Sequence, residues 1–151
     1  MIGIAAITLM AAGCGKESVT PQESMEAALV GEWHLAQTEV DGTVLDTQSD
    51  VYLAINSDCT FELYQKSGDM LRYTKFTGSC SLKGNKLSGT YSDGTPWGSI
   101  YTAEVDGAVL ILTNETQNEV QKYNKEAISE EIKDEADVKS NAYTYDVEPI
   151  L

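Results

Sequence analysis

Apolar and polar positions alternate along the chain from Gly31 to Lys125, and Gly, Asn and Asp interrupt the alternation every several residues. A period of two is typical of antiparallel β-strands with one buried face, whereas an amphipathic helix has a period of about 3.6 residues. The pattern therefore predicts eight strands. They span residues 32–40, 50–55, 59–65, 72–83, 86–91, 97–105, 108–113 and 119–125.

The turns between these strands predict their registers, because each turn fixes which residues of its two strands face each other. The turns at residues 56–58, 84–85 and 106–107 predict these pairs: Ile55 with Cys59, Leu53 with Phe61, Val51 with Leu63, Leu82 with Leu87, Cys80 with Gly89, Gly78 with Tyr91, Val105 with Ala108, Ala103 with Leu110, and Tyr101 with Leu112. The looser connections add Phe61 with Gly78, Leu63 with Phe76, Tyr91 with Trp97, and Gly89 with Ser99. Every pair falls on the same face of the strands, and that face is the apolar one.

The connections between the predicted strands alternate in length. Those after the second, fourth and sixth strands are tight, whereas residues 41–49, 66–71, 92–96 and 114–118 form longer loops. In an up-and-down meander, alternate connections lie at the same end, so tight turns close one end and longer loops ring the other. The sequence thus predicts an all-β fold, an eight-stranded up-and-down antiparallel barrel over residues 29–125.

A C-terminal helix and tail, residues 126–151, are expected to follow the barrel. Ser129 can cap a helix over residues 130–139 that begins with two acidic residues near the positive end of its dipole. One face of this helix is apolar and carries Ile128, Ile132 and Ala136. We predict one α-helix packed outside the sixth and seventh strands, the alternative being a solvated acidic tail. The apolar residues 149–151 are expected to dock at a place that the pattern does not specify.

The N-terminal residues indicate where in the cell the protein is located. Residues 2–12 are apolar or small, and this run is too short to cross a hydrocarbon core of about 30 Å. With Ala11-Ala12-Gly13 before Cys14, residues 1–13 resemble a bacterial lipoprotein signal peptide, whose cleavage leaves Cys14 as a lipidated N-terminus. The polar residues 14–28 show no apolar period and are expected to form a flexible tether. The alternative is a buried N-terminal strand with an unrelated cysteine.

A family resemblance rests on the start of the first strand, where Gly31-x-Trp33 stands, together with the strand count and the following helix. In these features residues 29–139 resemble the lipocalins. They are similar in particular to lipocalin-like lipoproteins of Gram-negative bacteria, through two short motifs, Asn56-Ser57-Asp58-Cys59-Thr60-Phe61 and Asn85-Lys86-Leu87-Ser88-Gly89-Thr90-Tyr91. The resemblance implies a location in the cell envelope of a Gram-negative bacterium, lipid-anchored to a membrane. It also implies a basic residue packed on Trp33, for which Lys122 and Lys125 are both candidates.

The cysteines of the barrel depart from the resemblance. Cys59 replaces the glycine of the family's turn, which costs up to about 1 kcal/mol if the position needs a positive φ. The predicted registers place Cys59 across from Cys80, and opposed thiols on neighbouring strands can oxidise outside the cytoplasm. A disulfide between Cys59 and Cys80 is one hypothesis, and two small buried residues are the other.

Charge and composition argue against several classes of partner and site. The net charge of −14 repels phosphate backbones, which argues against nucleic acid as a partner. His34 is the only histidine, points away from the inward Trp33, and has no second histidine with which to build a zinc site. The spacing of Asp41, Asp46 and Asp50 matches no calcium-binding loop, so we interpret them as solvated loop carboxylates. We expect no cofactor, no metal and no catalysis.

The open end of the predicted barrel is the candidate site. Its ligand-binding residues are expected to be Gln37, Val51, Leu63, Phe76, Tyr91, Trp97, Ser99 and Leu112. A small number of polar groups among apolar ones suits a small hydrophobic or amphipathic molecule. The leading hypothesis is a membrane-anchored binding protein, and the alternative is a filled barrel that acts as a protein-interaction module of the cell envelope, because small residues facing large ones can mean either a cavity or interdigitation.

Overall fold

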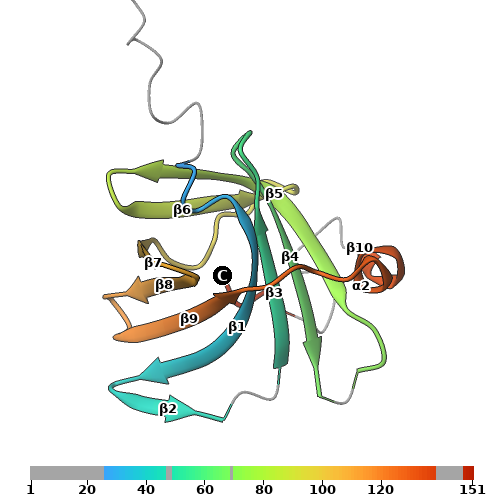
Figure 1. Cartoon of the computed structure of the whole chain (residues 1–151), viewed down its shortest axis with the longest axis horizontal. Helices are drawn as coiled ribbons and strands as arrows, with labels where there is room; N and C mark the ends of the chain where they lie inside the picture. Colours follow the sequence, from blue (N-terminus) through green and yellow to red (C-terminus); the bar gives the residue numbers. More distant parts are fainter. Residues whose placement is uncertain (1–25, 47–48, 69, 139–147) are drawn as a thin grey trace, which may run out of the picture.

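The computed structural model describes residues 26–46, 49–68, 70–138 and 148–151. Eight antiparallel strands close into a barrel (Figure 1), as the alternation predicts. They are β1 (Gly31–Val40), β3 (Ser49–Ile55), β4 (Thr60–Ser67), β5 (Thr74–Lys83), β6 (Lys86–Tyr91), β7 (Tyr101–Asp106), β8 (Val109–Asn114) and β9 (Glu119–Lys125). Each pairs with the next along the chain, and β9 closes the ring on β1.

The registers on either side of β5 are confirmed. Across the Gly84-Asn85 turn, Leu82 pairs with Leu87 and Gly78 pairs with Tyr91. Gly84 takes a positive φ of 65°, the conformation for which glycine is suited in such turns. On the other side of the strand, the predicted pairs of Phe61 with Gly78 and Leu63 with Phe76 also form.

Two predicted registers are wrong by two residues. Ile55 pairs with Phe61, because Cys59 lies in the turn with a φ of 68° and is not the first residue of the strand. Val105 pairs with Leu110, because the second turn is formed by residues 107–108 rather than 106–107. The inward faces are nevertheless those predicted, since a shift of two residues preserves the alternation.

The start of β7 also differs from the prediction. The strand begins at Tyr101 and not at Trp97, so the expected pairs of Tyr91 with Trp97 and of Gly89 with Ser99 do not form. Instead, the Trp97 N–H donates to the Gly89 carbonyl at 2.8 Å, next to an isolated bridge between Thr90 and Pro96. The chain thus leaves the ladder where proline has no N–H to donate.

Two short strands were not predicted. β2 (Thr43–Leu45) folds back on β1 through a turn in which Asp41 and Gly42 have φ values of 53° and 79°. Asp-Gly is a strong hairpin signal within the segment that the sequence assigns to a loop. β10 (Asp137–Val138) pairs in parallel with Thr74 and Lys75 of β5, beyond the residues of β5 that pair with β6.

The helix α2 (Glu130–Glu135) begins at the predicted cap, where the Ser129 side chain accepts the Ile132 N–H at 3.3 Å. It is shorter than predicted, because Ala136 is extended and the chain continues into β10. Its predicted position is wrong. Figure 1 shows it outside β4 rather than outside β7 and β8. Its apolar face packs with residues of the outer wall, namely Tyr52, Ala54, Tyr64 and Tyr73.

Contacts at the end of β9 explain where the helix docks. Glu32 of β1 accepts the Ile128 N–H at 2.8 Å and forms an ion pair with Lys133, also at 2.8 Å. These contacts direct the chain across β1 towards β3 and β4. Ile100, which the sequence places under the helix, remains 63% exposed.

Candidate functional site

The closed end of the barrel is filled with large side chains. Trp33 is fully buried, its indole N–H donates to the Leu29 carbonyl at 3.0 Å, and the Lys125 ammonium lies 4.9 Å from its ring centroid. Lys125 is therefore the basic residue that the resemblance implies. The other fully buried residues of the lumen include Leu53, Leu87 and Leu110, so apolar side chains pack tightly around Trp33.

Two inward-facing glycines allow close packing inside the barrel. A Cβ at Gly89 would clash with the Trp97 indole, most closely with Cε2, and would lie 2.6 Å from Nε1 and 2.7 Å from Cδ2. A Cβ at Gly78 would clash first with the Thr90 main-chain oxygen and would lie 2.8 Å from Phe61 Cε1 and from Tyr91 Cα. Gly89 is thus interdigitated with a large side chain, whereas Gly78 allows the main chain of β6 to approach closely. Trp97 packs edge-on against Phe61, with ring centroids 5.1 Å apart.

The loop end, here called the mouth, is the part of the lumen with polar walls. Five polar side chains are buried in the described structure: Thr38, Gln65, Thr74, Asn114 and Gln121. A cavity of about 170 Å³ lies beside two of them, Thr38 and Gln121, and its other lining residues are Leu35, Ser49, Val51, Glu119 and Ile150. Ligand pockets are commonly roughly 300 Å³ or larger, so this space admits only a small ligand as it stands.

Residues 148–151, here called the tail, occupy the mouth, and Figure 1 marks the C-terminal end within the barrel ring. The Gln65 side-chain amide donates to the Glu148 carbonyl at 2.8 Å and accepts the Ile150 N–H at 3.1 Å. The Tyr91 hydroxyl donates to the Leu151 carbonyl oxygen at 2.6 Å. Leu151 is 4% exposed and belongs to the main core. The tail is thus held through both its main chain and its side chains.

Seven of the eight residues proposed for the ligand site lie on or near the lumen. Val51, Leu63, Phe76 and Leu112 are buried in its wall, Tyr91 contacts the tail, and Trp97 covers Gly89. Ser99 accepts the Asn114 side-chain N–H at 2.7 Å. Of this set, the structure places Val51 at the cavity and Tyr91 against the tail, whereas Trp97 packs in the aromatic cluster.

Gln37 is placed differently from its prediction. A β-bulge between Leu35 and Gln37 inserts an extra residue into β1, so that Gln37 pairs with Lys122 and hydrogen-bonds to Glu39 on the outer wall. Thr38 takes the inward position and pairs with Gln121. A strict alternation assigns Gln37 to the lumen, and the bulge reverses that assignment.

The tyrosine hydroxyls near the mouth remain protonated at neutral pH. Burial, with a contribution from Glu119, raises the pKa of Tyr101 to about 12. Burial likewise raises the pKa of Tyr123 well above its ordinary value, and this hydroxyl donates to Gln121 at 2.6 Å. These groups act as hydrogen-bond donors and are not poised as bases.

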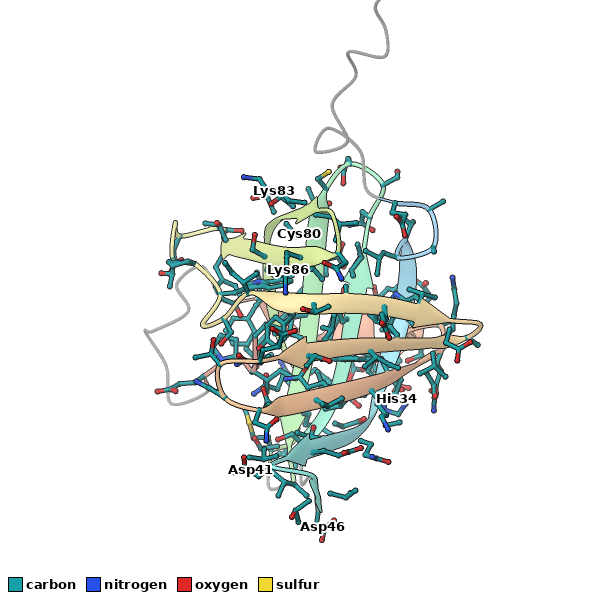
Figure 2. The ribbon with its side chains drawn as sticks, turned by 90° about the vertical axis from the view of Figure 1, so that its left-hand side faces the viewer. His34, Asp41, Asp46, Cys80, Lys83 and Lys86 are labelled. Atoms are coloured by element: carbon teal, nitrogen blue, oxygen red, sulfur yellow. The ribbon has the colours of Figure 1, made fainter. Side chains whose placement is uncertain are left out.

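His34 lies on the outer wall, as predicted, and Figure 2 shows it away from Asp41 and Asp46 of the β1–β2 region. It contacts two carboxylates: Asp50 Oδ1, 2.6 Å from Nε2, and Glu126 Oε1, 3.1 Å from Nδ1. Burial alone would lower the pKa of His34, but these two hydrogen bonds outweigh it and raise the pKa. The histidine therefore links Glu126, in the segment after β9, to Asp50 of β3. No three metal-ligating side chains converge within the described residues.

Cys59 and Cys80 are close neighbours, as the predicted registers require. The Cys80 N–H donates to the Cys59 carbonyl at 2.8 Å. Burial, together with Cys59 and Asp58, raises the pKa of the Cys80 thiol to about 12. A disulfide between them stays a prediction, and Cys14 with the predicted signal peptide and most of the predicted tether lies outside the described residues. Among the residues that the structure covers, no helix has the length and apolarity needed to cross a bilayer.

Sequence reasoning missed three features of the mouth: Gln65, Gln121 and the place where the tail docks, although docking of residues 149–151 was itself expected. Both glutamines occupy inward positions opposite apolar residues, Gln65 across from Val51 and Gln121 across from Leu112. A polar residue at an inward position was the signal available, because a buried amide needs partners. This signal could not predict which group Gln65 binds, because Glu148 lies 83 positions further along the chain.

Comparison with known proteins matches residues 29–112 to the family model for a lipocalin-like domain. Two solved structures are similar to the chain. A lipoprotein YedD from Klebsiella pneumoniae subsp. pneumoniae MGH 78578 is 12% identical, with 80% of this chain and 91% of that chain covered and a TM-score of 0.49. An uncharacterized protein from Bacteroides eggerthii DSM 20697 is 17% identical, with 65% and 99% covered and a TM-score of 0.49. No curated protein sequence matches the chain.

Proposed function

The chain belongs to the lipocalin-like domain family, whose model matches more than half of it, and from this premise we propose that it binds a small hydrophobic or amphipathic ligand in the mouth of its barrel. A lipocalin-like barrel is in general a ligand-binding fold and typically not a catalytic one. The observation that carries the proposal is the mouth itself, where buried polar side chains stand among apolar walls. Such a combination suits a ligand with an apolar body and a few polar groups.

Ligand binding in the mouth is tested by a substitution that fills the cavity with a larger side chain. Val51 is fully buried and lines the cavity, whereas Val44 of β2 is 58% exposed. Val51→Trp should weaken saturable binding of dansyl-labelled undecanoic acid about tenfold or more, and Val44→Trp, the matched control, should leave it unchanged. If the unaltered chain binds no such probe and carries no extractable lipid in native mass spectrometry, the ligand-binding proposal is wrong.

The second part of the proposal is the anchor. Cys14 follows three small residues and an apolar run, so we propose that it is lipidated and holds the protein on a membrane of the Gram-negative cell envelope. Several acyl chains at about 0.8 kcal/mol per buried methylene are sufficient for stable attachment. Cys14→Ser should move the protein from the membrane to the soluble fraction, and an unchanged distribution would exclude this anchor.

The alternative function is a protein-interaction module of the cell envelope, and the occupied lumen is the observation that favours it. Apart from the cavity of about 170 Å³ in the mouth, the described barrel interior is occupied by its own side chains and by the tail. Tyr91→Ala separates the two functions. Loss of probe binding with intact capture of an envelope partner supports the ligand-binding barrel, and the reverse result supports the interaction module.

A further inference from the structure

Gln65 contacts the tail as a neighbouring strand would. Its side-chain amide donates to one main-chain carbonyl and accepts the N–H two residues further along, from Glu148 and Ile150. Gln65 is itself only 5% exposed. A buried amide without hydrogen-bond partners destabilises the fold, so this side chain requires a main-chain-like partner within the mouth.

The walls around Gln65 select the side chains of that partner. Leu151 lies in the core, Ile150 packs against it, and the Tyr91 hydroxyl binds the Leu151 oxygen. The remaining cavity of about 170 Å³ adjoins Ile150 and has Leu35 and Val51 in its walls. The mouth therefore combines amide recognition with space for aliphatic groups.

We propose that the mouth is a receptor for an extended, peptide-like chain with aliphatic side chains, and that the tail is its built-in occupant, which a ligand from outside must displace. This inference rests on the proposed function, because it assigns a ligand class to the same end of the barrel. Because the tail is part of the same chain, its binding is intramolecular, and a covalently linked partner typically has an effective concentration on the order of millimolar, so even a site of modest affinity is filled by the tail.

The inference is tested by supplying the tail as a separate molecule. The probe is a fluorescein-labelled peptide with the sequence of residues 148–151, and its binding is followed by anisotropy. A chain without residues 148–151 should bind the peptide saturably, and the unaltered chain should bind it at least about tenfold more weakly. Introducing Gln65→Leu into the shortened chain should weaken peptide binding about tenfold, since two hydrogen bonds are lost.

A second variant covers the case in which the shortened chain does not fold. Leu151→Asp in the full chain places a charge in the core and should expel the tail, so it should also open the mouth to the peptide. Leu71→Asp is the matched control, because Leu71 is 96% exposed and distant in sequence from the tail. It should leave the mouth closed. The inference is overturned if neither opened variant binds the peptide.

The same variants separate this inference from the proposed function. Peptide binding without any binding of dansyl-labelled undecanoic acid supports the receptor and contradicts the amphiphile-binding function. Binding of the fatty-acid probe alone does the opposite. In the unaltered chain, saturating fatty-acid probe should raise the hydrogen-exchange rate of the Ile150 amide, which loses its bond to Gln65. An unchanged rate in a chain that binds the probe overturns displacement of the tail.

Discussion

Gly89→Ala is the sharpest test of how the barrel interior is packed. The added Cβ would clash most closely with Trp97 Cε2 and would lie 2.6 Å from Nε1 and 2.7 Å from Cδ2, so every one of these contacts is about 1 Å or more inside the 3.5–4.0 Å optimum. The indole cannot retreat freely, because its ring centroid lies 5.1 Å from that of Phe61 and 6.2 Å from that of Tyr101.

The net cost follows from two opposed effects. Overpacking of a buried site costs about 1–3 kcal/mol, and we expect the upper part of this range because the clash involves a buried, rigid ring. Replacing glycine by alanine within a strand returns about 0.5–1 kcal/mol. Gly89→Ala should therefore lower the free energy of unfolding by about 2 kcal/mol.

Urea denaturation followed by far-ultraviolet circular dichroism measures this loss. With a slope of about 2 kcal/mol per molar urea, the midpoint should fall by about 1 M. Gly98→Ala is the matched control, since nothing lies within 4 Å of its added Cβ, and its midpoint should change little. Trp97→Phe should recover part of the loss in the Gly89→Ala background, with a coupling of about 0.5–3 kcal/mol. Equal midpoints for the two alanine variants would refute the reasoning.

Three further predictions concern single side chains. His34→Gln should destabilise the fold most at and below about pH 6.5 and least at alkaline pH. The pKa of His34 is raised in the folded state, so the charged histidine stabilises the fold until the pH rises through that raised value. A pH-independent difference in thermal stability between the two proteins would contradict this. Cys59→Gly should raise stability by about 0.5–1 kcal/mol under reducing conditions by relieving a φ of 68°, and a loss in urea titration would contradict it. Trp33→Phe should cost more than Trp97→Phe in the same titration, because the Trp33 indole N–H donates to the Leu29 carbonyl, whereas the buried Trp97 indole N–H has no partner in the described structure.

The barrel could be predicted because each strand shows the alternation of apolar and polar residues within its own sequence. A residue's face follows from a two-residue period, and one face here is apolar throughout. The faces therefore survived even where the register of β3 with β4 was wrong by two residues. The exceptions are local departures from ideal geometry. The bulge beside Gln37 inserts one residue and reverses its face, whereas the positive φ of Cys59 keeps that residue in the turn and shifts the register by two residues.

The candidate site was only partly predictable, for a different reason. Inward residues such as Val51 and Tyr91 follow from the alternation, so the wall of the lumen could be named. What fills the lumen depends on whether Trp97 settles on Gly89 and whether Leu151 enters the mouth. These contacts join residues far apart in the chain or outside any regular strand, where no period connects them.

The sequence by itself determined the alternation that forms eight strands and the capped start of a helix after the last strand, and it predicts an N-terminal segment of lipoprotein type. The tertiary structure decided the outer wall on which that helix packs and the occupant of the mouth. The physical reason is that local periodicity is set by neighbouring residues, whereas Glu32 with Lys133 and Gln65 with the tail are bonds between partners that only the closed barrel brings within reach.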